Sequence, residues 1–195
     1  MSTTLTPETT LGAVNRMLGG IGLDPVNSLI NDKDADVASA LQVLHRVSRD
    51  VQTKGWDFNT DEDYKLSRNS SNEIALPKNT ISWKVSPKNH GSADIVERKR
   101  KLYDRKKQSF KFDGDIYVDI IFFFDFEDIP SAARSYISTR ATREYVSDVL
   151  PNEMGYQTAS QEETQAHATF LREHSITKTN MLRKNTQRRG RYVHR

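Results

Sequence analysis

The sequence predicts an α+β protein: a bundle of about four helices, an inserted antiparallel β-sheet region and a basic C-terminal arm. Apolar residues recur at helical steps before residue 64 and after residue 128, whereas short extended runs separated by turns fill the interval. The 195 residues allow one or two small domains, and only 35% of them are hydrophobic. Such a thin core is typical of a subunit whose stability is completed by neighbours.

Two helices are predicted in the first segment, residues 1–63. Thr6-Pro7-Glu8 is expected to begin the first, because proline in a first turn loses no hydrogen bond, and Gly19-Gly20 is expected to end it. Asp32, Asp34 and Asp36 predict the acidic start of the second helix, which should end at Gly55. The apolar stripes are Leu11, Val14, Leu18 and Ile21 in the first helix and Val37, Leu41, Leu44, Val47 and Val51 in the second.

The next segment, residues 64–128, is predicted to form an antiparallel sheet. Extended runs are expected at residues 73–76, 80–85, 94–98, 101–103, 109–112 and 116–124. Asp113-Gly114-Asp115 is a hairpin signal. The run from Ile116 to Phe124 alternates and then becomes wholly apolar, which predicts a central strand covered on both faces or buried against another subunit.

Two more helices are predicted over residues 129–182. Ala133, Ile137, Ala141 and Tyr145 recur at steps of four, and their small members would let another helix approach closely. Ser160-Gln161-Glu162-Glu163 resembles a capping box, so the fourth helix is expected to begin there after breaks at Pro151 and Gly155. Its expected core face is Ala159, Ala166 and Phe170. Residues 183–195 are predicted to be a basic flexible tail.

Several classes of protein conflict with the composition. The chain has no cysteine, which removes disulfides, thiolate zinc sites, iron–sulfur clusters and cysteine nucleophiles. The longest apolar run, Ile120 to Phe124, is far shorter than a membrane span, and the first residues lack a secretory signal. We therefore expect a protein that stays in the cytoplasm where it is made.

Charge is distributed in alternating blocks although the net charge is only +3. Residues 1–75 carry −4, residues 76–115 carry +6, residues 116–182 carry −5 and residues 183–195 carry +6. Such blocks suit complementary contacts between protein surfaces at least as well as a nucleic-acid groove.

No cofactor, metal site or catalytic residue is predicted. Asp32, Asp34 and Asp36 have the spacing of a calcium loop, but the later glycine and glutamate of such a loop are missing, so a helix cap is favoured. His167 and His174 are seven residues apart, which is not a chelating spacing, and a solvated pair of Glu163 with His167 is favoured instead. The remaining histidines, His45, His90 and His194, form no motif.

Two alternative functions stay open on the residues alone. Acidic clusters at residues 61–63 and 125–128 allow a cell-wall glycan hydrolase, which needs two carboxylates and a raised pKa on one of them. The basic runs 98–101 and 105–107, with Tyr103 and Phe110 between charges, allow a DNA-binding module. A hairpin edge protected by charge, or a subunit contact, is favoured for those runs.

One series of short motifs runs in order through nearly the whole chain. It begins with Ala13-Val14-Asn15, Leu18, Ile21-Gly22, Pro25-Val26 and Leu29. Its most specific part is Gly55-Trp56-Asp57-Phe58-Asn59 after the aspartate-led helix. In these positions the chain resembles the tail tubular protein A family of short-tailed bacteriophages. The other matching positions are Asp34-Ala35-Asp36, Gln52, Tyr103-Asp104-Arg105, Phe126, Asp128, Pro130, Tyr136-Ile137, Ala141, Arg143 and Asn180-Met181-Leu182. The end of the chain departs from the family by being more basic.

The resemblance implies a non-enzymatic head–tail adaptor located in the virion tail. It implies a homo-oligomeric ring, which is a dodecamer in this family. The ring would dock on the portal protein and carry the nozzle protein (tail tubular protein B). It would also support tail-fibre attachment and let genomic DNA pass without sequence-specific binding. The candidate portal-contact arm is Arg183, Lys184, Arg188, Arg189, Arg191 and Arg195. Candidate subunit or nozzle contacts are Arg98, Arg100, Tyr103, Arg105, Ile120, Phe122 and Phe124.

Overall fold

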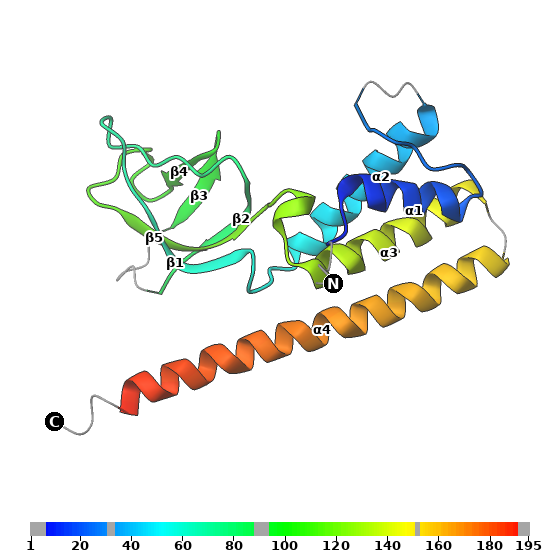
Figure 1. Cartoon of the computed structure of the whole chain (residues 1–195). Coiled ribbons are helices and arrows are strands. Elements are labelled where there is room, and N and C mark those ends of the chain that lie inside the picture. Colours follow the sequence, from blue (N-terminus) through cyan, green and yellow to red (C-terminus); the bar gives the residue numbers. More distant parts are fainter. Residues whose placement is uncertain (1–6, 31–33, 88–93, 151–152, 191–195) are drawn as a thin grey trace. The chain divides into compact units, whose positions relative to one another are not determined.

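A computed structural model of the chain has an α+β fold, as the sequence predicts (Figure 1). It describes residues 7–30, 34–87, 94–150 and 153–190, with side chains omitted at 153–155 and 178–190. The chain divides into a helical unit, Met1–Val51 with Asp125–Arg195, and a β unit, Gln52–Phe124. The boundary expected between residues 63 and 64 falls inside the first strand, so the Gly55-Trp56-Asp57-Phe58-Asn59 motif belongs to the β unit.

Helix α1 (Thr10–Gly20) begins three residues later than the sequence suggested, because Thr9 is its N-cap and accepts a hydrogen bond from the Gly12 amide at 3.0 Å. It ends at Gly20, as the sequence predicted, although neither Gly19 nor Gly20 has a positive φ. The residue with positive φ is Gly22, at 81°, and the Gly22 and Leu23 amides donate to the carbonyls of Gly19 and Leu18. This is a Schellman ending, in which glycine takes the left-handed position without a Cβ penalty.

Helices α2 (Ala35–Thr53) and α3 (Ser131–Val149) supply most of the remaining helical core. A short 3-10 turn, η1 (Phe126–Asp128), precedes α3. The predicted stripe on α3 is confirmed, since Ala133, Ile137, Ala141 and Tyr145 are all at most 1% exposed. Asp34 caps α2 by accepting from the Asp36 amide at 2.9 Å, which is the structural role expected for this acidic run, whereas Asp32 lies outside the described residues.

Helix α4 (Glu153–Gly190) is longer than expected at both ends. It begins seven residues before Ser160 and contains Gly155, so the predicted break at Gly155 is wrong. At its far end it includes residues 183–190, for which the sequence predicted a flexible tail, and residues 191–195 lie outside the described residues. Local composition underestimates this helix because Lys, Arg and Gln are themselves good helix formers.

The β unit contains two small antiparallel sheets rather than the single sheet predicted. One has the order β1-β5-β2, made of β1 (Thr60–Leu66), β5 (Ile116–Phe122) and β2 (Thr80–Val85). The other is the hairpin of β3 (Ile95–Arg98) and β4 (Lys101–Asp104). The expected runs at 73–76 and 109–112 form isolated bridges rather than strands. Asp113-Gly114-Asp115 does not form a hairpin turn, because the run before it bridges to Glu73 whereas β5 after it pairs with β1 and β2.

Strand β5 alternates between a buried and a half-exposed face. Val118, Ile120 and Phe122 are at most 8% exposed and lie in the core of the β unit. Tyr117, Asp119 and Ile121 are half-exposed on the other face. Strand β5 is central in its sheet, as predicted, but the chain itself covers only one of its faces fully. Burial of the second face against another subunit stays a prediction. The rest of the core is formed by Leu66, Ile74, Leu76, Leu102 and Phe112.

Candidate assembly surfaces

The Gly55-Trp56-Asp57-Phe58-Asn59 motif builds the point where the chain enters the β unit. Gly55 has a φ of 72°, and a Cβ added there would lie 2.7 Å from Cδ1 of Ile121, so both backbone conformation and space require glycine. Asn59, 1% exposed, receives the Trp56 amide on Oδ1 and donates from Nδ2 to the carbonyls of Gln52 and Phe122. The motif is therefore a structural junction centred on the buried side chain of Asn59.

Gln52 completes this junction by binding the segment that leaves the β unit. Its Nε2 donates to the Phe124 carbonyl and its Oε1 accepts from the Phe124 amide, both at 2.9 Å. The side chain thus bonds both backbone groups of Phe124, as a residue of a paired strand would. The Gln52 side-chain amide is 0% exposed, and these bonds satisfy both its donor and its acceptor. The entering and leaving segments of the β unit are tied to one another by one side chain.

The basic run at residues 98–101 forms the β3–β4 hairpin turn. Lys99 and Arg100 have φ values of 53° and 60°, the type I′ geometry that suits the twist of paired strands. Arg100 Nη2 donates to the carbonyls of Pro77 at 2.6 Å and Lys78 at 3.1 Å, which fastens the turn to a neighbouring loop. Two of the predicted contact residues, Arg98 and Tyr103, contact one another, with the guanidinium 3.9 Å above the ring.

Most cations of the two basic runs pair within the β unit. Lys101 binds Glu73 at 2.5 Å and Arg105 binds Asp94 at 2.8 Å. Hydrogen bonding between Lys107 and Asp113 raises the pKa of the lysine and lowers that of the aspartate. Because a phosphate would have to compete with these carboxylates, the pairing favours the charged hairpin edge over a nucleic-acid surface.

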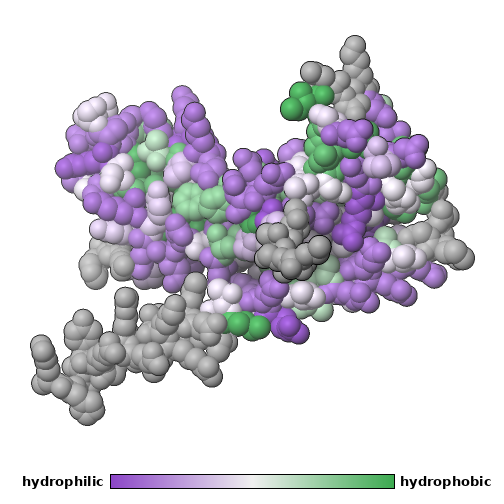
Figure 2. Space-filling model, viewed as in Figure 1, coloured by the Kyte–Doolittle hydropathy of each residue, from purple (hydrophilic) through white to green (hydrophobic). Residues whose placement is uncertain are grey.

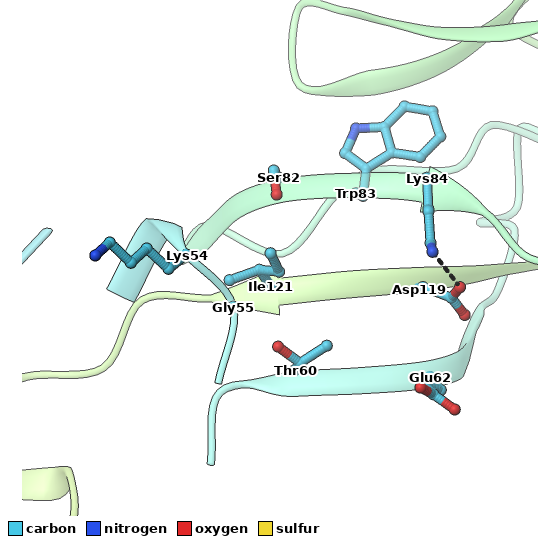
Figure 3. A pocket seen from close by; sticks show the side chains of 9 residues that line it. All are labelled: Lys54, Gly55, Thr60, Glu62, Ser82, Trp83, Lys84, Asp119 and Ile121. Atoms are coloured by element: carbon cyan, nitrogen blue, oxygen red, sulfur yellow. Dashed lines mark ion pairs between the residues drawn. The ribbon is translucent and has the colours of Figure 1, made fainter. Parts of the chain in front are cut away.

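The open face of the β1-β5-β2 sheet carries a hollow of about 300 Å³ (Figure 3). Figure 3 shows Thr60 and Glu62 of β1, Asp119 and Ile121 of β5, and Ser82 and Lys84 of β2 along it. The ion pair between Lys84 and Asp119, 3.4 Å, crosses its floor. With opposite charges already paired and one half-exposed apolar side chain, this face suits contact with another protein surface.

Three of the predicted contact residues come from β5 or the segment after it, and they differ in exposure. Ile120 is 0% exposed and Phe122 is 8% exposed, so the core of their own unit accounts for their apolar character. Sequence periodicity could not separate a strand buried within its chain from one buried against another copy. Phe124 is half-buried and packs against this core.

Glu127 and Asp63, one from each acidic cluster, have structural partners. Glu127 accepts a hydrogen bond at 2.9 Å from the Thr10 amide at the N-terminus of α1, and this bond lowers its pKa. A general acid needs the opposite shift. In the other cluster, Asp63 accepts from the Ser86 hydroxyl and its amide donates to Asp119, so it shapes the bulge in β1.

An ion pair and stacked rings join helices α3 and α4. Arg143 binds Glu163, so the predicted pairing of Glu163 with His167 is replaced by a contact between helices. The Tyr136 ring stacks on His167 at 4.7 Å and on Phe170 at 5.7 Å between centroids. His167 is thus a packing residue.

Glu144 centres a second charged cluster in the helical unit. It accepts from Arg46 Nη1 at 2.8 Å and Arg140 Nε at 2.9 Å. Burial raises its pKa, but hydrogen bonds and charges of the two arginines outweigh burial and hold the pKa below its usual value. Among the residues whose side chains are described, no three His, Asp or Glu residues are arranged to hold a metal ion.

Large apolar side chains remain exposed on the helical unit, although most of the surface in view is hydrophilic (Figure 2). These residues are Leu23, Ile30, Val149, Leu150, Tyr156, Leu171 and Ile176. On α4, Phe170 is buried, whereas no residue of 171–177 is. Arg183, Lys184, Arg188 and Arg189 lie in the last turns of α4, and Arg191, Arg195, His90 and His194 lie outside the described residues. No helix within the described ranges is long and apolar enough to cross a membrane.

A small α+β chain with buried polar junctions, internally paired charges and exposed apolar patches has the features of a structural assembly protein. The comparisons with known proteins agree: the chain belongs to the tail tubular protein family, whose model matches residues 11–180. It is a structural component of a bacteriophage tail. The chain is 27% identical over 191 residues to tail tubular protein A of Klebsiella phage KP34, covering 94% of this chain and 98% of that relative.

Proposed function

We propose that this tail protein is the head–tail adaptor of its virion. Copies would form a closed ring, with a dodecamer as the expected size, between the portal protein above and the nozzle protein below. Tail fibres would attach near that junction, and the genome would pass through the ring without sequence-specific contacts. In this role the protein performs no chemistry, and specific association is its activity.

The observation that carries this proposal is the exposed outer part of α4. The segment after Phe170 has no buried side chain at residues 171–177 and exposes Leu171 by 40% and Ile176 by 53%. A helical segment that buries none of its side chains gains little from packing against its own chain, so a partner surface would stabilise it. An enzyme that acts alone does not need such a segment. An adaptor must bind a partner on each side, and the exposed end of α4 would supply one of the two binding surfaces.

Two sets of residues are proposed as contacts of the ring. The hairpin residues Arg98, Arg100 and Arg105 are exposed, and Tyr103 beside them is half-buried. Together with half-buried Phe124 they would meet a neighbouring subunit or the nozzle. The arm at residues 183–195, with six Lys and Arg and no acidic residue, would meet an acidic surface of the portal. Ile120 and Phe122 are not part of the proposed surface.

The test is to mix the purified chain with portal rings and to view the mixture by electron microscopy. We expect a discrete complex with added density on one face of the portal. A matched variant with Arg183, Lys184, Arg188 and Arg189 replaced by glutamine should bind more weakly, and its binding should depend less on salt. Failure of the unmodified chain to form a complex at any salt concentration would refute the adaptor role.

The same preparation tests the two other functions. A DNA-binding module would shift duplex DNA with a steep salt dependence. A glycan hydrolase would clear peptidoglycan and lose that activity in Asp125→Asn or Glu127→Gln variants that still fold. We expect neither result, because the cations of the hairpin are paired and the pKa of Glu127 is lowered.

A further inference from the structure

The two ends of α4 carry exposed apolar side chains. At its beginning, Leu23, Val149, Leu150 and Tyr156 lie where α1 and α3 end and α4 starts, and we call these four residues the corner patch (Figure 1). Gly20 fixes this arrangement, since a Cβ there would lie 2.8 Å from Val146 of α3. Figure 2 shows hydrophobic atoms at the same end of the helical unit.

The second surface is the outer segment of α4, residues 171–184. Arg143 contacts Glu163 and Tyr136 contacts Phe170, so α3 and α4 run antiparallel and the first residue of α3 lies opposite about residue 175. Helix α4 continues to Gly190, which carries it about 22 Å past the start of α3 at 1.5 Å per residue. Leu171 and Ile176 are exposed there.

The charges of these two surfaces are complementary. Outside the outer segment, residues 1–51 and 125–170 of the helical unit hold seven Lys and Arg against fourteen Asp and Glu. Exposed Asp24 and Asp148 adjoin the corner patch in the sequence. The outer segment holds Arg172, Lys178, Arg183 and Lys184 against Glu173 alone. Acidic and basic surfaces that each contain exposed apolar residues favour contact with one another.

A single chain cannot make this contact with itself. Tyr156 and Ile176 belong to one uninterrupted helix, and the twenty residues between them span about 30 Å. The outer segment of one copy can reach only the corner patch of another copy. Because the two surfaces differ, the contact is heterologous, and its repetition gives a closed ring or an open filament rather than a two-fold dimer.

We infer that the outer segment of α4 seats on the corner patch of the next copy and is the contact that propagates the ring. This inference deepens the proposed function and rests on it only for the closure of the ring. Residues 185–195 extend beyond the seated segment and stay available for the portal. The contact is therefore compatible with the role proposed for the arm.

The absence of cysteine from the chain makes a disulfide test specific. Exposed Leu150 and Ile176 are each replaced by cysteine, and the variants are oxidised both as purified protein and in phage particles carrying the substitutions. We expect the double variant Leu150→Cys/Ile176→Cys to give a ladder of linked chains. Neither single variant should cross-link, and a mixture of the two single variants should give dimers only.

The matched control is Leu150→Cys/Gln161→Cys, which places the second cysteine on an exposed position in the middle of α4. It should give no ladder. Absence of cross-links from the double variant in both purified protein and particles would overturn the inference, and so would single variants that dimerise as readily as their mixture. A ladder without portal binding would support this contact and refute the adaptor role. Portal binding without a ladder would support the adaptor role and refute this contact.

Discussion

Replacing Asn59 by alanine should destabilise the β unit strongly. The substitution removes three hydrogen bonds, from the Trp56 amide and to the Gln52 and Phe122 carbonyls, at 2.7, 2.9 and 2.9 Å. The Gln52 carbonyl keeps the Gly55 amide as a donor at 3.1 Å. Removing a hydrogen-bond partner from a buried group costs about 1–3 kcal/mol, so the other two bonds predict a loss of at least about 2 kcal/mol. That is a large fraction of the free energy of unfolding of a small domain, about 5–15 kcal/mol.

The assay is urea unfolding followed by tryptophan fluorescence. Both tryptophans, Trp56 and Trp83, lie in the β unit, so the signal reports the unfolding of this unit selectively. With a slope of about 1–1.5 kcal/mol per M for a unit of this size, a loss of about 2 kcal/mol lowers the midpoint by about 1.3–2 M or more. The matched control is Asn79→Ala, which removes an exposed bond to the Phe123 carbonyl that water can replace.

The reasoning is refuted if Asn59→Ala and Asn79→Ala lower the midpoint by similar amounts. A third variant, Asn59→Asp, sharpens the test. It keeps an acceptor for the Trp56 amide but places a carboxylate against two carbonyl oxygens. It should therefore be less stable at neutral pH than at acidic pH, where the protonated acid can donate again.

The remaining predictions concern the helical unit. Gly19→Ala should stabilise it by about 0.5–1 kcal/mol, since a Cβ there meets nothing within 4 Å, whereas Gly20→Ala should destabilise it by about 1–3 kcal/mol through a clash with buried Val146. Thermal melts followed by circular dichroism would check the pair, and equal effects would contradict it. The hydrogen bond from the Thr10 amide lowers the pKa of Glu127 in the folded chain. This bond therefore stabilises the fold fully at pH values above the pKa of an unfolded glutamate. The stabilisation is lost as the pH falls through the lower pKa of the folded chain. Glu127→Gln should flatten this acid limb in pH-dependent unfolding curves, and an unchanged limb would assign the dependence to other carboxylates.

Local sequence determined those features that arise within one helix or one strand. The step of four in Ala133, Ile137, Ala141 and Tyr145 identified the buried face of α3, because any helix brings such residues to one side. β2 was also predicted with its observed bounds, residues 80–85. The spacing of Asp34 and Asp36 identified a helix cap, since the capping bond joins neighbouring residues.

Tertiary structure decided everything that depends on which segments meet. No pattern in the sequence states that Gln52 binds Phe124, that Glu127 caps α1, or that Arg143 pairs with Glu163. These partners are separated by 72, 117 and 20 residues, and local periodicity carries no information about contacts over such separations. The apolar run of β5 shows the same limit. Its composition requires burial, but only the packing of the β unit shows that Ile120 is inside and Ile121 faces the open side.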